Sequence, residues 1–283
     1  MLLWRLEHHT ESCRRVSYSK DGKYLLTASK DKSVVITENG QFCCRIQKTH
    51  KAPLSALIHI ENTVFATGDD NGVVKVWDIK SQSQTALKPV MSFEVQLDTI
   101  TEFALDEFKG CLIATSNDGT LTAYDLRKVG GEVQDRSNSF EEDLSSLALL
   151  KSGNKVAVGS ITGRLHLFSR ELLQVSDDRI SGHPESVESI AKMDEDTIIT
   201  GCEDGLIRAI GVHPNKILST PYRMGEGQSI QRVAISGDKG LGGVISENTI
   251  SFFDLRSVRD RDKLTHKVHK EKESDPFFDN LMN

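Results

Sequence analysis

One pattern of apolar and polar positions recurs six times along the chain. Each copy has a small apolar segment, a Ser, Thr or Gly, an acidic or Asn-containing turn, and an alternating segment that typically ends in an aromatic residue. The copies read TASKDKSVVIT (27–37), ATGDDNGVVKVWD (66–78), ATSNDGTLTAYD (114–125), VGSITGRLHLF (158–168), TGCEDGLIRAI (200–210) and GVISENTISFFD (243–254). Aligned on the second turn residue, they repeat at intervals of 40, 47, 44, 42 and 43 residues, the six anchors being Lys32, Gly72, Gly119, Gly163, Gly205 and Asn248.

Each copy predicts a β-hairpin, because Gly and Asn tolerate the positive φ of tight turns and the following residues alternate in polarity. About twenty residues before each anchor lies another alternating apolar segment, at 16–18, 54–57, 100–103, 144–147, 187–190 and 230–233. More variable strands, such as 42–46 and 91–95, precede these segments. The repeat unit is therefore four short strands in about 43 residues.

No stretch of ten or more residues has a convincing 3.6-residue period, which argues against alternating strands and helices. A lone four-stranded unit cannot bury both faces, whereas radially arranged units bury each sheet against its neighbours. The sequence thus predicts an all-β propeller with six recognisable blades over residues 1–256. Residues 2–6 are expected to form an outer strand, either closing the ring on the last blade or belonging to a blade that is missing.

The triplet Val76, Trp77 and Asp78 resembles the signature of WD40 repeats, with weaker forms at 123–125 and 252–254 and a Gly-His element at 182–183. In that family a His, a Ser or Thr, an Asp and the Trp form a buried hydrogen-bond network within a blade. The resemblance implies such networks in the second and fifth copies, neither of them complete. The second offers His50, Thr67 and Trp77 with Asn71 in place of Asp, and the fifth offers His183, Thr200 and Asp204 with Ile210 in place of Trp.

Four longer segments resemble the WD-repeat protein 55 family. They are HTESCRRVSYSKDGKYLLTASKD, ATGDDNGVVKVWD, DEDTIITGCEDGLIRAIGVHPNKI and the DPFF near the end. This resemblance implies a role in ribosomal RNA processing in the nucleus and nucleolus, with the cytoplasm as a further compartment, exercised through contacts with pre-ribosomal assembly factors. The family has seven repeats, so the six copies here correspond to its second to seventh.

Charge and composition narrow the function further. The formal net charge is −6, whereas proteins that hold nucleic acid through its phosphates usually carry a basic excess, so direct nucleic-acid binding is not expected. Five cysteines without regular spacing argue against a disulfide framework. No signal peptide and no apolar run of membrane-spanning length is recognised, which favours a reducing compartment without membrane association.

Two tripeptides carry the most specific candidate for partner binding. Asp125 and Arg127, and likewise Asp254 and Arg256, flank a Leu directly after an aromatic residue. The aromatic-Asp-x-Arg pattern resembles the box by which WD40 proteins dock on the adaptor of cullin-RING ubiquitin ligases, and a planar guanidinium suits such a polar interface. The alternative is an ordinary strand end with a solvated Arg.

Motifs for catalysis, cofactors and metals are not recognised. The sequence has no Gly-x-Ser-x-Gly, His-Glu-x-x-His or P-loop, and the spacing of His8, His9, His183 and His213 matches no metal-ligand pattern. Cys43 and Cys44 are adjacent and must face opposite sides of a strand, one in the core and one half exposed. We therefore expect no enzyme, no cofactor and no metal site.

Residues 257–283 change in character. They are polar and basic at first, which predicts disorder, and then place Phe277 and Phe278 in an acidic setting. The two aromatics are interpreted either as a short protein-docking motif or as a tail that folds back onto the propeller. The sequence as a whole predicts a protein-interaction scaffold in ribosome biogenesis, with a cullin-RING substrate receptor as the alternative.

Overall fold

The computed structural model describes residues 7–80, 88–128, 130–225, 227–247, 249–256 and 258. In this part of the chain the strands follow one another from Cys13 to Asp254, and no helix occurs before Arg256. No described helix is long and apolar enough to cross a membrane. The chain divides into two compact units, Met1–Val187 and Glu188–Asn283.

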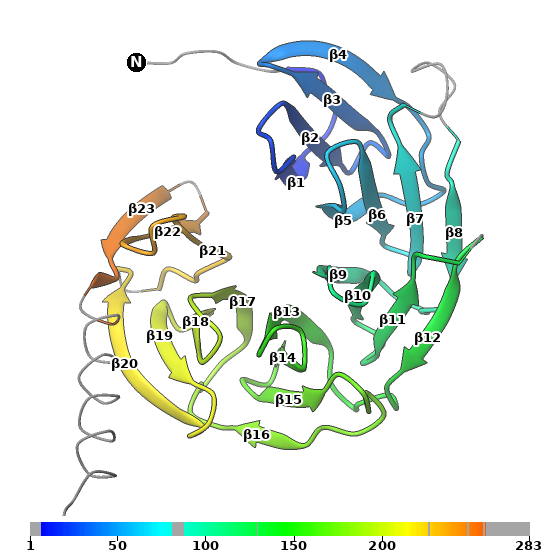
Figure 1. Ribbon diagram of the computed structural model, residues 1–283. Coiled ribbons are helices and arrows are strands. Elements are labelled where there is room, and N and C mark those ends of the chain that lie inside the picture. The colour runs from blue at the N-terminus through cyan, green and yellow to red at the C-terminus, as the bar shows by residue number, and fades with distance from the viewer. Residues whose placement is uncertain are drawn as a thin grey trace, which may run out of the picture. The chain divides into compact units, whose positions relative to one another are not determined.

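Four antiparallel sheets, which we call blades 1 to 4, make up the first unit, and in each blade the strands are neighbours in chain order (Figure 1). Blade 1 contains β1 Cys13–Tyr18, β2 Tyr24–Ser29, β3 Val34–Glu38 and β4 Gln41–Ile46. Blade 2 contains β5 Leu54–His59, β6 Val64–Asp69, β7 Val73–Asp78 and β8 Met91–Glu94. Blade 3 contains β9 Ile100–Asp106, β10 Cys111–Ser116, β11 Leu121–Asp125 and β12 Glu132–Arg136, and blade 4 contains β13 Leu144–Leu150, β14 Lys155–Ser160, β15 Leu165–Ser169 and β16 Asp178–Ile180.

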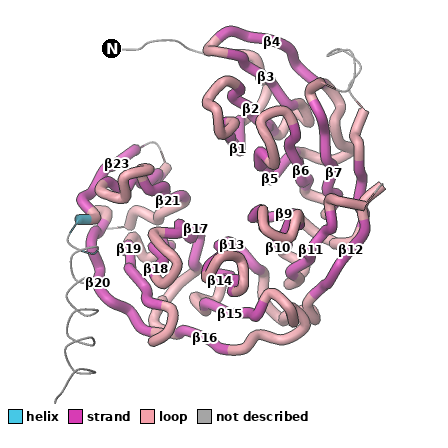
Figure 2. Tube along the Cα trace, in the orientation of Figure 1, coloured by secondary structure: helices cyan, strands magenta, loops and turns pink. Residues whose placement is uncertain are grey.

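The second unit contains blades 5 and 6. Blade 5 has β17 Val187–Lys192, which begins at the last residue of the first unit, β18 Thr197–Cys202, β19 Leu206–Gly211 and β20 Lys216–Arg223. Blade 6 has three strands in the described residues, β21 Arg232–Ile235, β22 Leu241–Ser246 and β23 Thr249–Asp254. Figure 2 shows that short loops join the strands within both blades.

The six antiparallel sheets confirm the predicted fold class, a WD40-type β-propeller. Each turn anchor in the described residues lies between the second and third strands of its blade, as the hairpin pattern predicts. The segment predicted at 230–233 is shifted, because the Ile230 N–H binds the Cys202 carbonyl and β21 starts only at Arg232. Residues 2–6, Asn248 and nearly all of 257–283 lie outside the described residues, so the expectations for them and for the tail boundary stay predictions.

The hairpin turn explains why glycine is favoured at the anchors. Gly72 and Gly119 have φ values of 78° and 74°, and a Cβ added there would lie 2.3 Å and 2.2 Å from the carbonyl oxygens of Gln96 and Phe140, respectively. Blade 1 has Lys32 at this position with φ 66°. A side chain in this left-handed region costs on the order of 1 kcal/mol or more.

Adjacent blades of the first unit share their cores. One apolar cluster joins Ile36 of blade 1 to Leu54, Phe65 and Trp77 of blade 2, and similar clusters join blade 2 to blade 3 and blade 3 to blade 4. Each fully buried large apolar side chain contributes roughly 1.5–3 kcal/mol. The blades of the first unit therefore stabilise one another through shared cores.

Hydrogen bonds between inner strands reinforce these contacts. The second residue of the first strand of blade 3 donates to blade 4, from Thr101 Oγ1 to the Leu144 carbonyl at 2.7 Å, and Ser145 Oγ donates to the Val187 carbonyl at 2.5 Å within the first unit. Ser55 occupies the same strand position in blade 2, but its buried hydroxyl has no partner in the described residues. The bond is therefore not required at every blade junction.

Candidate interaction site

A buried hydrogen-bond network lies inside blade 2. His50 Nε2 is 2.7 Å from Thr67 Oγ1, and Trp77 Nε1 donates to the same oxygen at 2.8 Å. Burial lowers the pKa of His50, which keeps the imidazole neutral. The network links the loop before β5 to β6 and β7, so it fixes the interior of the blade.

The carboxylate of this network is Asp69. Its Oδ2 lies 3.0 Å from His50 Nδ1, and its Oδ1 accepts the backbone N–H groups of Asn71 and Val73 at 3.0 and 2.9 Å. Burial opposes ionisation of Asp69, but these hydrogen bonds lower its pKa overall. The expectation of an incomplete network with Asn71 in the acidic position is therefore wrong, because a carboxylate at the end of β6 reaches the same imidazole.

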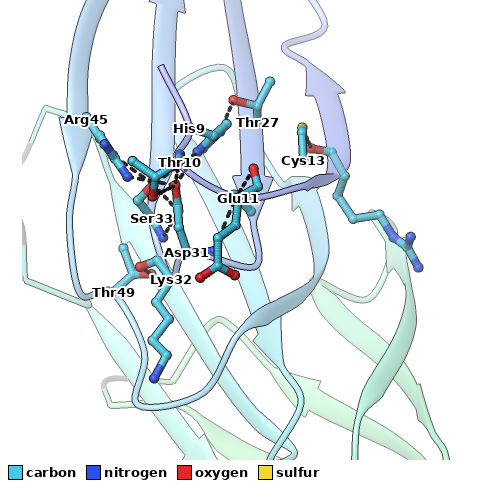
Figure 3. Close-up of polar contacts among 12 residues, drawn as sticks. His9, Thr10, Glu11, Cys13, Thr27, Asp31, Lys32, Ser33, Arg45 and Thr49 are labelled. Atoms are coloured by element: carbon cyan, nitrogen blue, oxygen red, sulfur yellow. Dashed lines mark hydrogen bonds and ion pairs between the residues drawn. The ribbon is translucent and has the colours of Figure 1, made fainter. Parts of the chain in front are cut away.

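Blade 1 holds a second network that the sequence analysis missed (Figure 3). His9 Nε2 lies 2.8 Å from Thr27 Oγ1, and His9 Nδ1 lies 3.3 Å from Asp31 Oδ2. Arg45 Nη2 binds the same carboxylate oxygen at 2.7 Å. Thr37 stands where blade 2 has its Trp, ten residues after the network Thr, and Arg45 adds contacts to Asp31 and Ser33 on the carboxylate side of the network.

Blades 3 and 4 fill the equivalent space with other side chains. In blade 3, Tyr124 Oη donates to Gln96 Oε1 at 3.0 Å. In blade 4, Phe140 and Phe168 meet edge to face with ring centroids 5.7 Å apart. The interior of a blade thus ranges from a polar network to an aromatic pair while the sheet stays the same.

In blade 5 the carboxylate of Asp204 binds the guanidinium of Arg208. Their two contacts measure 2.5 Å, from Nη2 to Oδ2, and 3.1 Å, from Nη1 to Oδ1. His183 is buried, and Thr200 Oγ1 donates to the Arg208 carbonyl at 3.4 Å. Arg208 is a member of this cluster that the sequence analysis did not name.

The two aromatic-Asp-x-Arg boxes share one backbone geometry. The N–H of Arg127 donates to Asp125 Oδ1 at 2.9 Å, and that of Arg256 donates to Asp254 Oδ1 at 2.8 Å. Lys80 makes the same contact with an Asp in blade 2, at 2.9 Å. This turn therefore ends the third strand in blades 2, 3 and 6, and any specificity comes from the side chain that follows.

The side chains of the two boxes differ. The Arg127 guanidinium donates two hydrogen bonds of 3.0 and 2.9 Å to the Asp125 carboxylate, which lower the pKa of Asp125 to about 2. Arg256 Nε lies 3.6 Å from Asp254 Oδ1, and its side chain is 78% exposed against 62% for Arg127. Each arginine is accessible on its own unit, but more of the Arg256 guanidinium is free to bind a partner.

A surface pocket of about 430 Å³ lies beside Arg127, lined by Lys109, Arg127, Gln134, Asp135, Arg170 and Glu171. Arg170 is only 2% exposed, and its Nη2 donates to Gln134 Oε1 at 2.8 Å. Its Nε faces Asp106 Oδ2 at 3.4 Å. The pocket thus lies between the box of blade 3 and the loop after β15 in blade 4, and one of its lining residues, Arg170, forms a buried ion pair with Asp106.

Other candidate groups have simpler environments. Cys44 is buried and Cys43 is half-buried, which confirms the prediction for this pair. Among the described residues no group of three or more His, Cys, Asp or Glu side chains is placed to hold a metal ion. Phe277 and Phe278 lie outside the described residues, so their docking role stays a prediction.

The chain is similar to known WD-repeat proteins over most of its length. The WDR55 family model matches residues 1–258. WD repeat-containing protein 55 of Rattus norvegicus is 33% identical over 260 residues, which cover 91% of this chain and 66% of the rat protein. The Arabidopsis thaliana protein of the same name is 34% identical over 90% of this chain and 70% of its own length, and the Dictyostelium discoideum homolog is 32% identical over 91% and 61%.

The chain therefore spans slightly less than two thirds of the length of the mammalian relatives. The names of these three relatives are not those of enzymes. The match nevertheless extends over nearly the whole of this chain, from blade 1 to blade 6, and the chain belongs to the WDR55 family.

Proposed function

We propose that this protein is a non-enzymatic interaction scaffold that takes part in ribosome biogenesis in the nucleus and nucleolus. The observation that carries the proposal is a division of chemistry within the first unit. The polar groups of the network in blade 2 bind one another inside the blade, whereas Arg127 and Phe108, the latter 81% exposed, project at the turns. Exposed Arg and aromatic side chains on a rigid support are typical of protein-binding surfaces.

The ribosomal part of the proposal rests on the family. The segments at 9–31, 66–78 and 194–217 carry the resemblance, and they lie in blade 1, blade 2 and blade 5. Since the net charge is −6, contacts with assembly factors fit the chain better than direct binding of ribosomal RNA. We therefore propose that the partners are proteins of pre-ribosomal particles.

Affinity purification of the tagged full chain from nuclear extract, followed by mass spectrometry, tests this proposal. Pre-ribosomal assembly factors should be enriched over a tagged Trp77→Ala control whose blade 2 is disrupted. Fluorescence microscopy of the tagged chain should show nucleolar accumulation. Recovery of no pre-ribosomal protein, or uniform cytoplasmic fluorescence, would contradict the proposal.

A second candidate function is that of a cullin-RING substrate receptor. The observation that favours it is the shared geometry of the two boxes, in which Arg127 and Arg256 both follow an Asp-capped turn and both are exposed. The same purification distinguishes the two functions, because ligase adaptor subunits would be enriched in place of pre-ribosomal factors.

A further inference from the structure

Five lysines gather around the loop 47–53, which joins blade 1 to blade 2; we call them the loop 47–53 cluster. They are Lys30 and Lys32 in the β2–β3 turn, Lys48 and Lys51 in the loop itself, and Lys75 on β7. Lys32 Nζ donates to the Lys51 carbonyl and Lys75 Nζ donates to the Thr49 carbonyl, both at 2.7 Å. Figure 3 shows Lys32 beside Thr49, whose N–H binds the Lys32 carbonyl at 3.0 Å.

No lysine of this cluster has an ion-pair partner within 4.0 Å in the part of the chain that the structure describes. Other surface lysines do, since Lys20 binds Glu107 and Lys155 binds Asp177, both at 2.6 Å. The cluster is therefore a local excess of positive charge on a chain whose net charge is negative.

The acidic groups around the cluster are mostly engaged elsewhere. Asp31 binds His9 and Arg45, Asp69 binds His50, and Asp70 binds Arg14, all between 2.7 and 3.3 Å. Glu11 and Glu94 are exposed and make no ion pair with these lysines in the described residues. Asp69 also keeps its charge, because its partner His50 is a neutral imidazole. With Glu11, Glu94 and Asp69 all counted against the five lysines, the cluster still has a positive charge.

The backbone holds two of these lysines in an unfavourable conformation. Lys32 and Lys48 have φ values of 66° and 53°, in the left-handed region that favours glycine. Gly72 and Gly163 occupy the position of Lys32 in blades 2 and 4. A strained lysine where other copies have glycine points to a use for its side chain.

The lysines also repel one another. Burial lowers the pKa of Lys75, the charges of Asp69 and Glu94 raise it, and the charge of Lys51 lowers it. An anionic ligand bound between them would relieve this repulsion and stabilise both ammonium groups.

We infer that the loop 47–53 cluster binds an acidic segment of a partner protein. The inference rests on the proposed scaffold function and adds the chemistry of one partner. An acidic peptide fits better than nucleic acid because the described residues of the cluster offer no exposed aromatic ring for base stacking, Trp77 being buried.

Fluorescence anisotropy with the full chain tests the inference, using a labelled oligoglutamate peptide and an oligouridylate of equal length. Lys48→Glu/Lys51→Glu should weaken oligoglutamate binding by about tenfold or more, and added salt should also weaken oligoglutamate binding by the parent protein. Lys216→Glu/Lys239→Glu, an equal charge change at exposed sites of the second unit, should leave binding unchanged. Lys30→Glu/Lys51→Glu serves as a second variant if the first fails to fold.

Three results would overturn the inference: no binding of oligoglutamate by the parent protein, an equal loss in the control variant, or tighter binding of the oligouridylate. Affinity purification separates this inference from the proposed function. If Lys48→Glu/Lys51→Glu recovers pre-ribosomal proteins as fully as the parent, the cluster inference is wrong and the scaffold function stands. If the parent recovers none while still binding oligoglutamate through the cluster, the proposed function is wrong and the acidic ligand stands.

Discussion

Blade 2 and blade 4 have the same strand order and hairpin turn but opposite interiors. Five residues before the anchor, blade 2 has Thr67 and blade 4 has Val158; five residues after it, they have Trp77 and Phe168. In blade 2 these residues form a hydrogen-bond network, whereas in blade 4 Phe168 packs against Phe140. The sheet is therefore specified by strand register and by burial between blades, and either interior is compatible with it.

The polar groups of blade 4 lie elsewhere. His166 on β15 is buried, and its Nε2 lies 2.7 Å from Glu142 Oε1. The contrast shows that blades place their buried polar groups at different positions, and that most but not all of these groups have partners. Replacing only some members of a hydrogen-bond network by apolar side chains leaves a buried polar group unpaired. This lowers stability more than either a full network or a fully apolar interior does.

The largest expected effect is common to both blades. Trp77→Ala and Phe168→Ala each remove a fully buried aromatic ring that packs in a core shared with a neighbouring blade. Each substitution should lower the free energy of unfolding by about 3–5 kcal/mol. Guanidinium unfolding followed by circular dichroism measures the change. A loss below about 1 kcal/mol in one blade only would show that its core contributes little.

Exchanging the network Thr of blade 2 and the equivalent Val of blade 4 should show how each interior contributes to stability. Thr67→Val removes the hydroxyl that binds both His50 and Trp77, and Val158→Thr buries a hydroxyl where blade 4 provides aromatic rings. Each should cost about 1–3 kcal/mol, because each leaves buried polar groups without partners. The same unfolding experiment applies. A neutral Thr67→Val would mean that the network contributes no net stability.

Acid should weaken blade 2 more than blade 4. Burial lowers the pKa of His59 to about 4 and also lowers the pKa values of His50 and His166. His59 and His50 belong to blade 2, whereas His166 belongs to blade 4. Since the folded pKa lies below the unfolded value of 6.5, the unfolded chain binds more protons between the two. Stability is therefore complete above pH 6.5 and falls as the pH drops towards 4, by up to about 1.4 kcal/mol per pH unit for each histidine.

Amide hydrogen exchange at pH 7 and pH 5 measures this effect blade by blade. Between pH 7 and pH 5, the amide protons of β5 and β6 should lose more protection than those of β14 and β15. His59→Gln should reduce the loss, while His213→Asn, at an exposed site of the second unit, should leave it unchanged. Equal losses of protection in both blades would contradict the assignment of the acid sensitivity to the histidines of blade 2.

The smallest effect on stability is expected at the two boxes. Arg127→Ala with Arg256→Ala should leave the unfolding midpoint unchanged, because both side chains are exposed. If the ligase interpretation holds, capture of the adaptor should fall sharply, and Arg256→Ala alone should account for most of the loss because its guanidinium is the freer one. Lys80→Ala, at the same turn of blade 2, serves as the control. Unchanged adaptor capture by the double variant would exclude docking through the boxes.

The repeat made the fold predictable, since each copy specifies a hairpin by itself and the spacing specifies the blade. The site was less predictable. Asp69 was overlooked because it stands two residues before the expected acidic position, and only the backbone shows that its carboxylate reaches His50. His9 carried a usable signal, lying 18 residues before Thr27 much as His50 lies 17 before Thr67.

The pocket beside Arg127 had no signal in the sequence. Arg170 and Asp106 are 64 residues apart and meet only because two blades pack together. The loop 47–53 cluster was hidden for the same reason, since its lysines come from two blades and are diluted by acids along the chain. Contacts between repeats depend on how sheets stack, and no single copy records them.

Sedimentation of nuclear extract on a sucrose gradient tests the central claim most directly. If the chain is a ribosome-assembly scaffold, the tagged full chain should migrate with pre-ribosomal particles, and high salt should release it, because exposed charged contacts are screened. Migration only as free protein in low salt, with pre-ribosomal particles intact in the same gradient, would contradict the claim.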